Sequence, residues 1–120
     1  KSLLEASGQI SKVMQKVQLD EYSAAAIFRE LYECIRQLGD AKLWLSGFEA
    51  KTHEPCMRAL MDEDVLDKLK LKHLDRFRHI RNDSNYRGIK VSVASANEII
   101  DFWQTCGVEI LEKLKKRAAV

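Results

Sequence analysis

The sequence predicts an all-α protein: an antiparallel, up-and-down four-helix bundle with one short extra helix. Its 120 residues contain one proline and five glycines, so few residues interrupt a helix. Apolar residues recur at spacings of three and four, which is the period of a helix with one buried face. The connections between these segments are short, and short loops join antiparallel neighbours in helical bundles. The length fits a single domain that spans residues 1–120.

The first two helices are expected over residues 2–18 and 21–46. Asp20 suits the N-cap of the second helix, because its carboxylate can accept hydrogen bonds from free backbone N–H groups, and Gly47 suits its end. Gly39 lies inside this helix, where glycine costs about 1 kcal/mol relative to alanine, so it marks a bend or a close contact between helices. The expected apolar faces are Ala6, Ile10, Val13 and Val17 on the first helix, and Ala24, Phe28, Leu31, Ile35 and Leu38 on the second.

Three more helical segments follow. A short helix holds Pro55 in its first turn, where the missing N–H is harmless. The next helix is expected over residues 65–83, followed by a loop over 84–92 and a last helix over 93–117 with Ser92 as its N-cap. The expected apolar faces are Leu66, Leu69, Leu74, Phe77 and Ile80 on the fourth helix, and Ile99, Trp103, Cys106, Ile110 and Leu114 on the last. Trp44 and Trp103 are expected in the core or in a dimer interface.

Cysteine usage indicates a reducing, cytoplasmic environment. The three cysteines are odd in number and widely spaced, which argues against a disulfide framework, and Cys34 and Cys106 fit buried thiols. His53 and Cys56 offer two zinc ligands without a second pair at ligand spacing, so no metal site and no cofactor is expected. No run of eighteen apolar residues occurs, so no membrane-spanning segment is expected.

Positive charge is concentrated in one part of the chain. The net charge of the whole sequence is +2, whereas residues 68–90 hold eight basic and two acidic residues, a local charge of +6. The remainder therefore carries −4. A basic segment on a nearly neutral protein fits an anionic partner at one face. A solvated helix flank is the alternative interpretation.

The densest part of this segment is residues 76–88, which include four arginines, a histidine and a tyrosine. The spacing from Leu74 through Phe77 to Arg81 places Arg81 on the inward face of the helix. A lone buried guanidinium is prohibitively costly, so Arg81 is either paired or faces a cleft or a subunit interface. Tyr86 can converge on Arg81 only if the helix unwinds over residues 83–85, which the sequence Asp-Ser-Asn favours.

The string from Arg81 to Tyr86 resembles the signature of HEPN domains (higher eukaryotes and prokaryotes nucleotide-binding). That motif is Arg, a polar residue and then His after four to six intervening residues. Residues 22–25, 41–48 and 53–54 also resemble the second helix of these domains and the turn that follows it, and residues 91–100 resemble the last helix. The resemblance covers nearly all of the chain. Arg81 and Asn82 match the motif, and Tyr86 occupies the position of the motif His.

The resemblance implies a helical homodimer whose two motifs meet in a shared cleft. Active members of the family are metal-independent ribonucleases, often toxins paired with a nucleotidyltransferase, and other members bind RNA or nucleotides without cleavage. Tyr86 is a departure with chemical consequences, because a tyrosine with an ordinary pKa near 10 is a poor base at neutral pH, whereas histidine is a good one.

We therefore expect an RNA- or nucleotide-binding module that uses Arg78, Arg81, Asn82, Tyr86 and Arg87, and that belongs to a toxin–antitoxin-like pair with a nucleotidyltransferase. The first alternative is a metal-independent endoribonuclease with Arg81, Asn82 and Tyr86 at the catalytic positions. The second is a structural or protein-interaction module that binds no nucleic acid.

Overall fold

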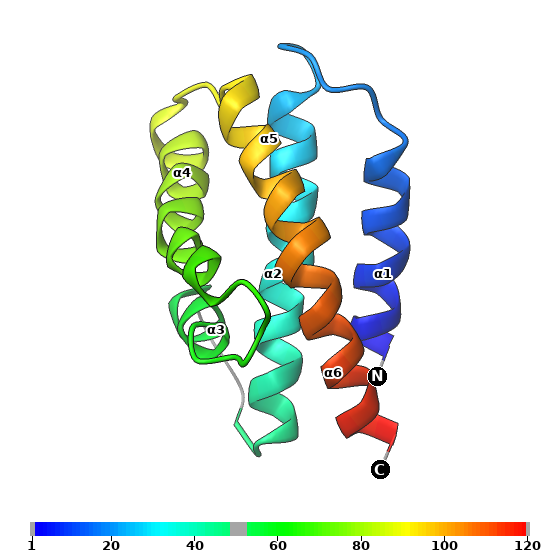
Figure 1. Ribbon diagram of the computed structural model, residues 1–120. Helices are drawn as coiled ribbons and strands as arrows, with labels where there is room; N and C mark the ends of the chain where they lie inside the picture. The colour runs from blue at the N-terminus through cyan, green and yellow to red at the C-terminus, as the bar shows by residue number, and fades with distance from the viewer. Residues whose placement is uncertain (1, 49–52, 120) are drawn as a thin grey trace.

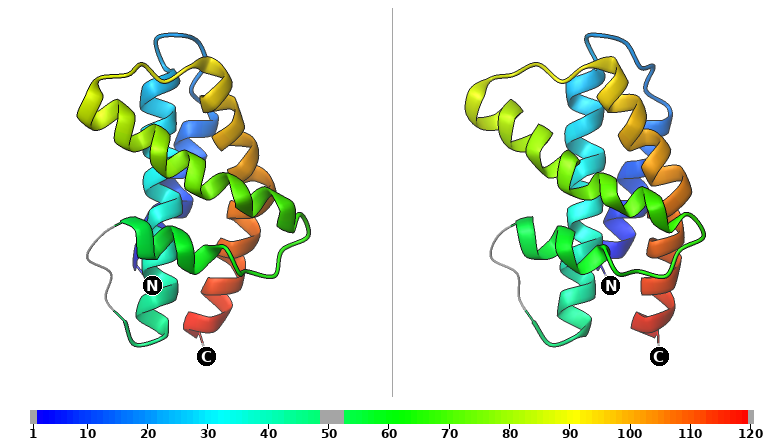
Figure 2. Two further views of the ribbon diagram at one scale, coloured as in Figure 1. Left: turned by 90° about the vertical axis from the view of Figure 1, so that its left-hand side faces the viewer. Right: turned by 60° about the vertical axis from the view of Figure 1, so that its left-hand side comes forward.

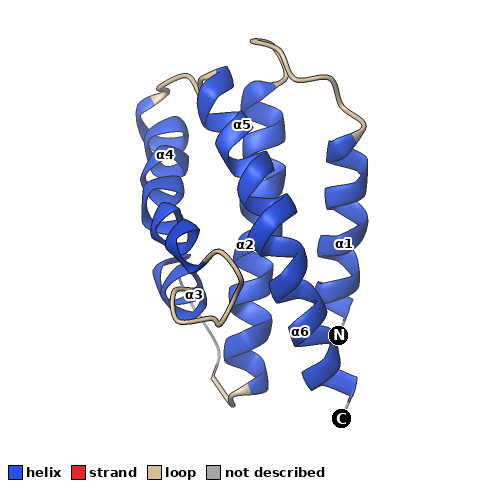
Figure 3. Cartoon of the chain, in the orientation of Figure 1, coloured by secondary structure: helices blue, strands red, loops and turns tan. Residues whose placement is uncertain are grey.

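The computed structural model describes residues 2–48 and 53–119, and over these residues it contains helices and loops and no strand (Figure 3). The α-helices are α1 (Ser2–Gln15), α2 (Ala24–Leu45), α3 (His53–Leu60), α4 (His73–Arg87), α5 (Val93–Phe102) and α6 (Val108–Ala119). A 3₁₀ turn, η1 (Lys68–Lys72), precedes α4, and a π turn, η2 (Trp103–Gly107), joins α5 to α6. The predicted all-α bundle is confirmed.

The four long segments of the bundle alternate in direction along the chain (Figure 1). Helix α1 runs towards one end, α2 returns, α4 runs forward again, and the continuous segment α5–η2–α6 returns to the end where the chain starts. Helix α3 is the predicted short extra helix. The expected last helix over 93–117 is therefore present, with Ser92 as its N-cap: the Ser92 hydroxyl accepts a hydrogen bond from the Ser95 N–H at 3.0 Å.

Helix α4 is held to the bundle by aromatic packing. Figure 2 shows α4 crossing in front of α2 and α5 at an oblique angle. The ring of Phe77 lies edge-on to Phe28 of α2, with centroids 6.0 Å apart, and edge-on to Phe102 of α5 at 5.5 Å. Edge-to-face pairs at these distances stabilise a core beyond the area that they bury. Phe77 thus fixes the part of α4 that precedes the predicted site.

The boundaries of the fourth helix differ from the prediction at both ends. Leu66 and Leu69 are 98% and 71% exposed, whereas Val65 and Leu71 are buried, so the predicted apolar face does not form, and regular α-helix begins only at His73. At the other end α4 continues to Arg87, where the predicted loop had already begun. Gly88 ends it in a left-handed conformation (φ 67°), which only glycine adopts without strain.

The apolar face predicted for the first helix is correct only in part: Ala6 and Ile10 are half-buried, and Ile10 packs against the core. Leu4, Ser7 and Ser11 are buried, whereas Val13 and Val17 are exposed. The buried hydroxyl of Ser7 lies 2.9 Å from the Leu3 carbonyl oxygen and 2.7 Å from Gln37 Oε1, and either oxygen can accept its proton, so the hydroxyl can be buried at little cost. Small side chains on this face let α1 lie close to α2.

The predicted faces of the second and last helices are confirmed, since all ten of their residues are buried. Trp103 is in the core, but Trp44 is 69% exposed and lies outside it. Cys34, Cys56 and Cys106 are free, buried thiols. Across the described parts of the chain, no helix is both long enough and apolar enough to cross a membrane.

Candidate anion-binding site

The predicted site residues all lie on α4, but on different sides of it. Arg78, Arg81 and Asn82 are half-buried, on the side of α4 that faces the bundle. Tyr86 is 82% exposed and Arg87 is exposed as well. The expected constellation therefore separates into an inner group and an outer group.

Tyr86 does not converge on Arg81. The helix continues without unwinding through Arg87, and five residues of α-helix turn the side chain by about 140°. The local preference of Asp83-Ser84-Asn85 for a turn is overridden, because Gly88 supplies a better helix end three residues later. His79 does not take the place of the motif His either: it is 61% exposed and pairs with Asp75, with Nε2–Oδ2 at 3.3 Å.

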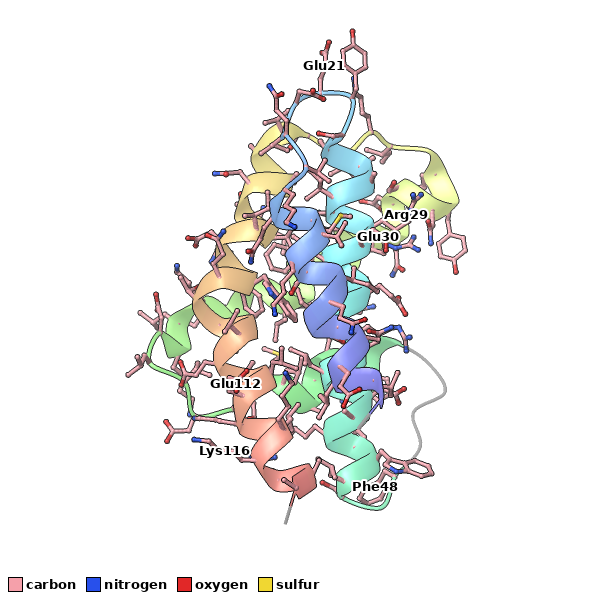
Figure 4. The ribbon with its side chains drawn as sticks, turned by 90° about the vertical axis from the view of Figure 1, so that its right-hand side faces the viewer. Glu21, Arg29, Glu30, Phe48, Glu112 and Lys116 are labelled. Carbon is pink, nitrogen blue, oxygen red and sulfur yellow. The ribbon has the colours of Figure 1, made fainter. Side chains whose placement is uncertain are left out.

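Helix α2 contributes a polar face that the sequence analysis missed. Arg29, Glu33, Arg36 and Asp40 recur at spacings of four, three and four, so they share one side of the helix. Figure 4 shows Arg29 and its neighbour Glu30 beside α2, on the side where the C-terminal part of α4 lies. The alternation of positive and negative residues at helical spacing could have been recognised in the sequence. The sequence does not show which neighbouring helix this face of α2 packs beside, because that depends on the packing of α4.

The side chain of Tyr32 marks where the polar faces of α2 and α4 meet. Its phenol is fully buried, and burial raises the pKa of Tyr32 to about 12. The positive charges of Arg78 and Arg81 on α4 act in the opposite direction on this pKa, as does Arg36 on α2, while Glu33 raises it further. Three guanidinium groups from two helices therefore lie within electrostatic range of one phenolic oxygen.

Two of these three arginines are paired with carboxylates. Arg36 Nε donates to Glu33 Oε1 at 2.9 Å and to Oε2 at 3.0 Å, and its Nη2 also contacts Oε1. These hydrogen bonds raise the pKa of the Arg36 guanidinium. Arg78 donates to Asp75 Oδ1 from Nη2 at 3.1 Å and from Nε at 3.3 Å. The contact with Arg78, and then the charge of His79, lower the pKa of Asp75.

Arg81 differs from its neighbours. Within residues 2–48 and 53–119, no carboxylate forms an ion pair with it, although its side chain is half-buried. Earlier along the same helix, Arg76 pairs with Glu98. A planar guanidinium can hold the oxygens of a phosphate or a carboxylate in two parallel hydrogen bonds. The arrangement is therefore able to bind an anion at Arg81, with the amide of Asn82 one residue further along.

The described residues contain no group of three or more His, Cys, Asp or Glu side chains that is arranged to hold a metal ion. Of the two zinc ligands considered above, Cys56 is buried and the side chain of His53 lies outside the described part of the structure.

Comparison of the chain with models of protein families, with curated proteins and with solved structures gives no match. The HEPN resemblance stays a hypothesis that rests on the residues quoted above.

Proposed function

We propose that this chain is an RNA- or nucleotide-binding module of the HEPN type, in which Arg81 holds a phosphate group beside the polar faces of α2 and α4. The observation that carries this function is the half-buried side chain of Arg81, which has no acidic partner in the described residues and, like Arg78, lies within electrostatic range of the phenol of Tyr32. Burial takes water away from a cation, and an anion restores the lost hydrogen bonds. Phosphate geometry matches the guanidinium fork.

The outer residues of α4 extend the proposed site. The exposed ring of Tyr86 can stack on a base, a contact worth about 1–3 kcal/mol in single-strand binding. Arg87 follows it, also exposed, and supplies a second cation for a phosphate further along an RNA strand. Asn82 offers both a donor and an acceptor beside Arg81.

Cleavage is not part of this proposal. Metal-free RNA hydrolysis needs a base for the 2′-hydroxyl and an acid for the leaving oxygen. Tyr86 stands at the position of the motif His but on a different side of α4 from Arg81, and His79 is engaged by Asp75. The geometry within one chain favours holding a phosphate over breaking its ester bond.

The proposed assembly is a homodimer, as the resemblance implies. Tyr86, Ile89 and Val93 are 82%, 52% and 40% exposed, and they offer apolar surface beside the site for a second copy. A nucleotidyltransferase partner in a toxin–antitoxin-like pair rests on the resemblance alone, and a cytoplasmic location rests on the free cysteines.

The test is the affinity for a short, labelled, single-stranded RNA at low salt, measured by fluorescence anisotropy. Arg81→Ala is expected to weaken binding roughly 10- to 100-fold, since a hydrogen bond to a charged group contributes about 1.5–3 kcal/mol. Lys72→Ala is the matched control, because it removes the same charge from the exposed N-terminal end of α4. Equal affinity of wild type and Arg81→Ala, or no binding by wild type, would overturn the proposal.

A further inference from the structure

We infer that Glu33 and Asp75 are specificity-determining residues of this site: they occupy Arg36 and Arg78, leave Arg81 as the open guanidinium, and so limit the inner site to one phosphate group. This inference rests on the proposed function, and it names the ligand chemistry more closely. Either a mononucleotide or one phosphate of an RNA strand supplies that group.

The Glu33–Arg36 contact resembles the bound state of an arginine–phosphate pair. Two oxygens of the Glu33 carboxylate receive hydrogen bonds from Arg36, as two oxygens of a phosphate would. The side chains of Arg36 and Glu33 are 23% and 36% exposed, so water screens this pair less than it screens a surface pair. A phosphate that binds Arg36 must first displace Glu33.

Asp75 also forms an ion pair with Arg78, but the Asp75 carboxylate is more exposed to solvent than that of Glu33. Arg78 is 20% exposed and Asp75 is 57% exposed, and Asp75 is shared with His79. Its carboxylate can turn into solvent with less cost than that of Glu33. Arg78 is therefore the easier of the two arginines to release.

The number of open arginines sets the size of the anion. Glu33 holds Arg36 and Asp75 holds Arg78, so Arg81 is the one of these three arginines without a carboxylate partner in the described residues. One phosphate group can bind Arg81, and each further phosphate at the inner site has to displace Glu33 or Asp75. The alternative is that Glu33 and Asp75 only stabilise their own helices, as ordinary pairs of acidic and basic residues do by about 0.2–0.5 kcal/mol. In that case, neutralising either carboxylate would not change the affinity for an anion.

The experiment compares Glu33→Gln and Asp75→Asn with Glu30→Gln, which removes the same charge from α2 at a residue whose only ion pair in the described structure is a 4.0 Å contact with Arg29. The probes are adenosine, adenosine monophosphate and a single-stranded RNA with a 5′-hydroxyl. Adenosine is expected not to bind. Glu33→Gln is expected to bind the two phosphate-containing probes about tenfold more tightly, because it frees one guanidinium.

Salt dependence counts the phosphates that are neutralised. Each adds about −0.7 to the slope of log K against log salt for a single strand, so Glu33→Gln and Asp75→Asn are each expected to steepen the slope for RNA by about that amount. Glu30→Gln is expected to leave it unchanged. The double variant Arg81→Ala/Glu33→Gln is expected to regain part of the affinity that Arg81→Ala loses, because the released Arg36 takes over the phosphate.

Some outcomes separate this inference from the function on which it rests. If Arg81→Ala abolishes binding while Glu33→Gln and Asp75→Asn match Glu30→Gln in affinity and slope, the site binds phosphate but the carboxylates do not tune it. If Arg81→Ala changes nothing, the proposed function itself fails. Two independent carboxylate variants keep the test decisive if one of them folds poorly.

Discussion

Gly39 of α2 lies directly against the backbone of Cys56 in α3. A Cβ atom at position 39 would overlap the carbonyl group of Cys56, and the thiol of Cys56 is itself fully buried. The two helices can approach this closely only because residue 39 has no side chain. Of the two sequence-based interpretations of Gly39, a bend or a close contact between helices, the structure shows the close contact.

Gly39→Ala is expected to destabilise the fold by about 1–3 kcal/mol, because the added methyl group meets backbone that cannot rotate away. Gly8→Ala is the matched control. Its Cβ would lie 3.5 Å from Leu111 Cδ2, an ordinary contact, so this variant is expected to gain up to about 1 kcal/mol from helix propensity. Urea denaturation followed by circular dichroism measures both. Equal stability of Gly39→Ala and wild type would show that α3 does not pack against α2 as described.

The sequence was sufficient for the helices whose apolar faces are packed along their length. The faces of α2 and of α5–η2–α6 follow the predicted spacing because neighbours cover them. The sequence was not sufficient where small polar residues are buried or where apolar residues lie at the surface. Ser7 and Ser11 are buried with hydrogen bonds to backbone carbonyls of α1, and Ser7 also reaches Gln37 of α2, whereas Leu66 and Leu69 are exposed. The hydrophobicity of the residues alone predicts neither the buried serines nor the exposed leucines.

The candidate site was predictable on one helix and not on the other. Local excess of charge pointed to Arg78 and Arg81 on α4. Glu33 and Arg36 read as an ordinary helical pair until the packing of α4 against α2 brings them near Tyr32. Tyr86 could converge on Arg81 only if the helix unwound over residues 83–85, but the end of α4 at Gly88 keeps position 86 helical.

The buried carboxylate of Glu63 is expected to depend on Lys42. Glu63 is 3% exposed, with Oε2 at 2.5 Å from Lys42 Nζ and Oε1 at 3.6 Å from Arg117 Nη2. Lys42→Met is expected to cost about 3–5 kcal/mol, because it leaves a buried charge without its nearer partner. The double variant Lys42→Met/Glu63→Leu is expected to recover most of that loss, since it removes both charges. Chemical denaturation checks the pair, and a double variant as unstable as the single one would contradict this explanation.

Stability is expected to fall at alkaline pH through two buried acids. Burial raises the pKa of Cys34 from 9.0 to about 12, and the pKa of Tyr32 from 10.0 to about 12. Below pH 9 both groups are neutral in the folded and unfolded states, so their contribution to stability is complete. As the pH rises further, the unfolded chain loses these protons first, and stability declines until the pH passes the folded pKa values.

The measurement is the free energy of unfolding in urea from about pH 8 to about pH 11. Tyr32→Phe is expected to flatten the decline above about pH 10, and Cys34→Ala to flatten it from about pH 9. The comparison uses the slope with pH, because either substitution also changes packing at every pH. Identical slopes in wild type and in both variants would show that these groups do not titrate late in the folded chain.

Tyr86→His restores the histidine of the motif, yet neither this variant nor wild type is expected to cleave RNA in EDTA as a single chain. Position 86 lies about 140° around α4 from Arg81, and its side chain points into solvent. Asn85→His is the matched comparison, since residues four apart share one face of a helix. It is expected to give slow cleavage that Arg81→Ala abolishes.

A different outcome for Tyr86→His would be informative about the dimer. Cleavage that needs Arg81 would show that the two positions meet after all. If its rate per chain rises with protein concentration, the histidine of one protomer reaches the phosphate held by Arg81 of its partner. If the rate per chain is independent of concentration, position 86 turns towards Arg81 within one chain, which contradicts the continuous helix through Arg87.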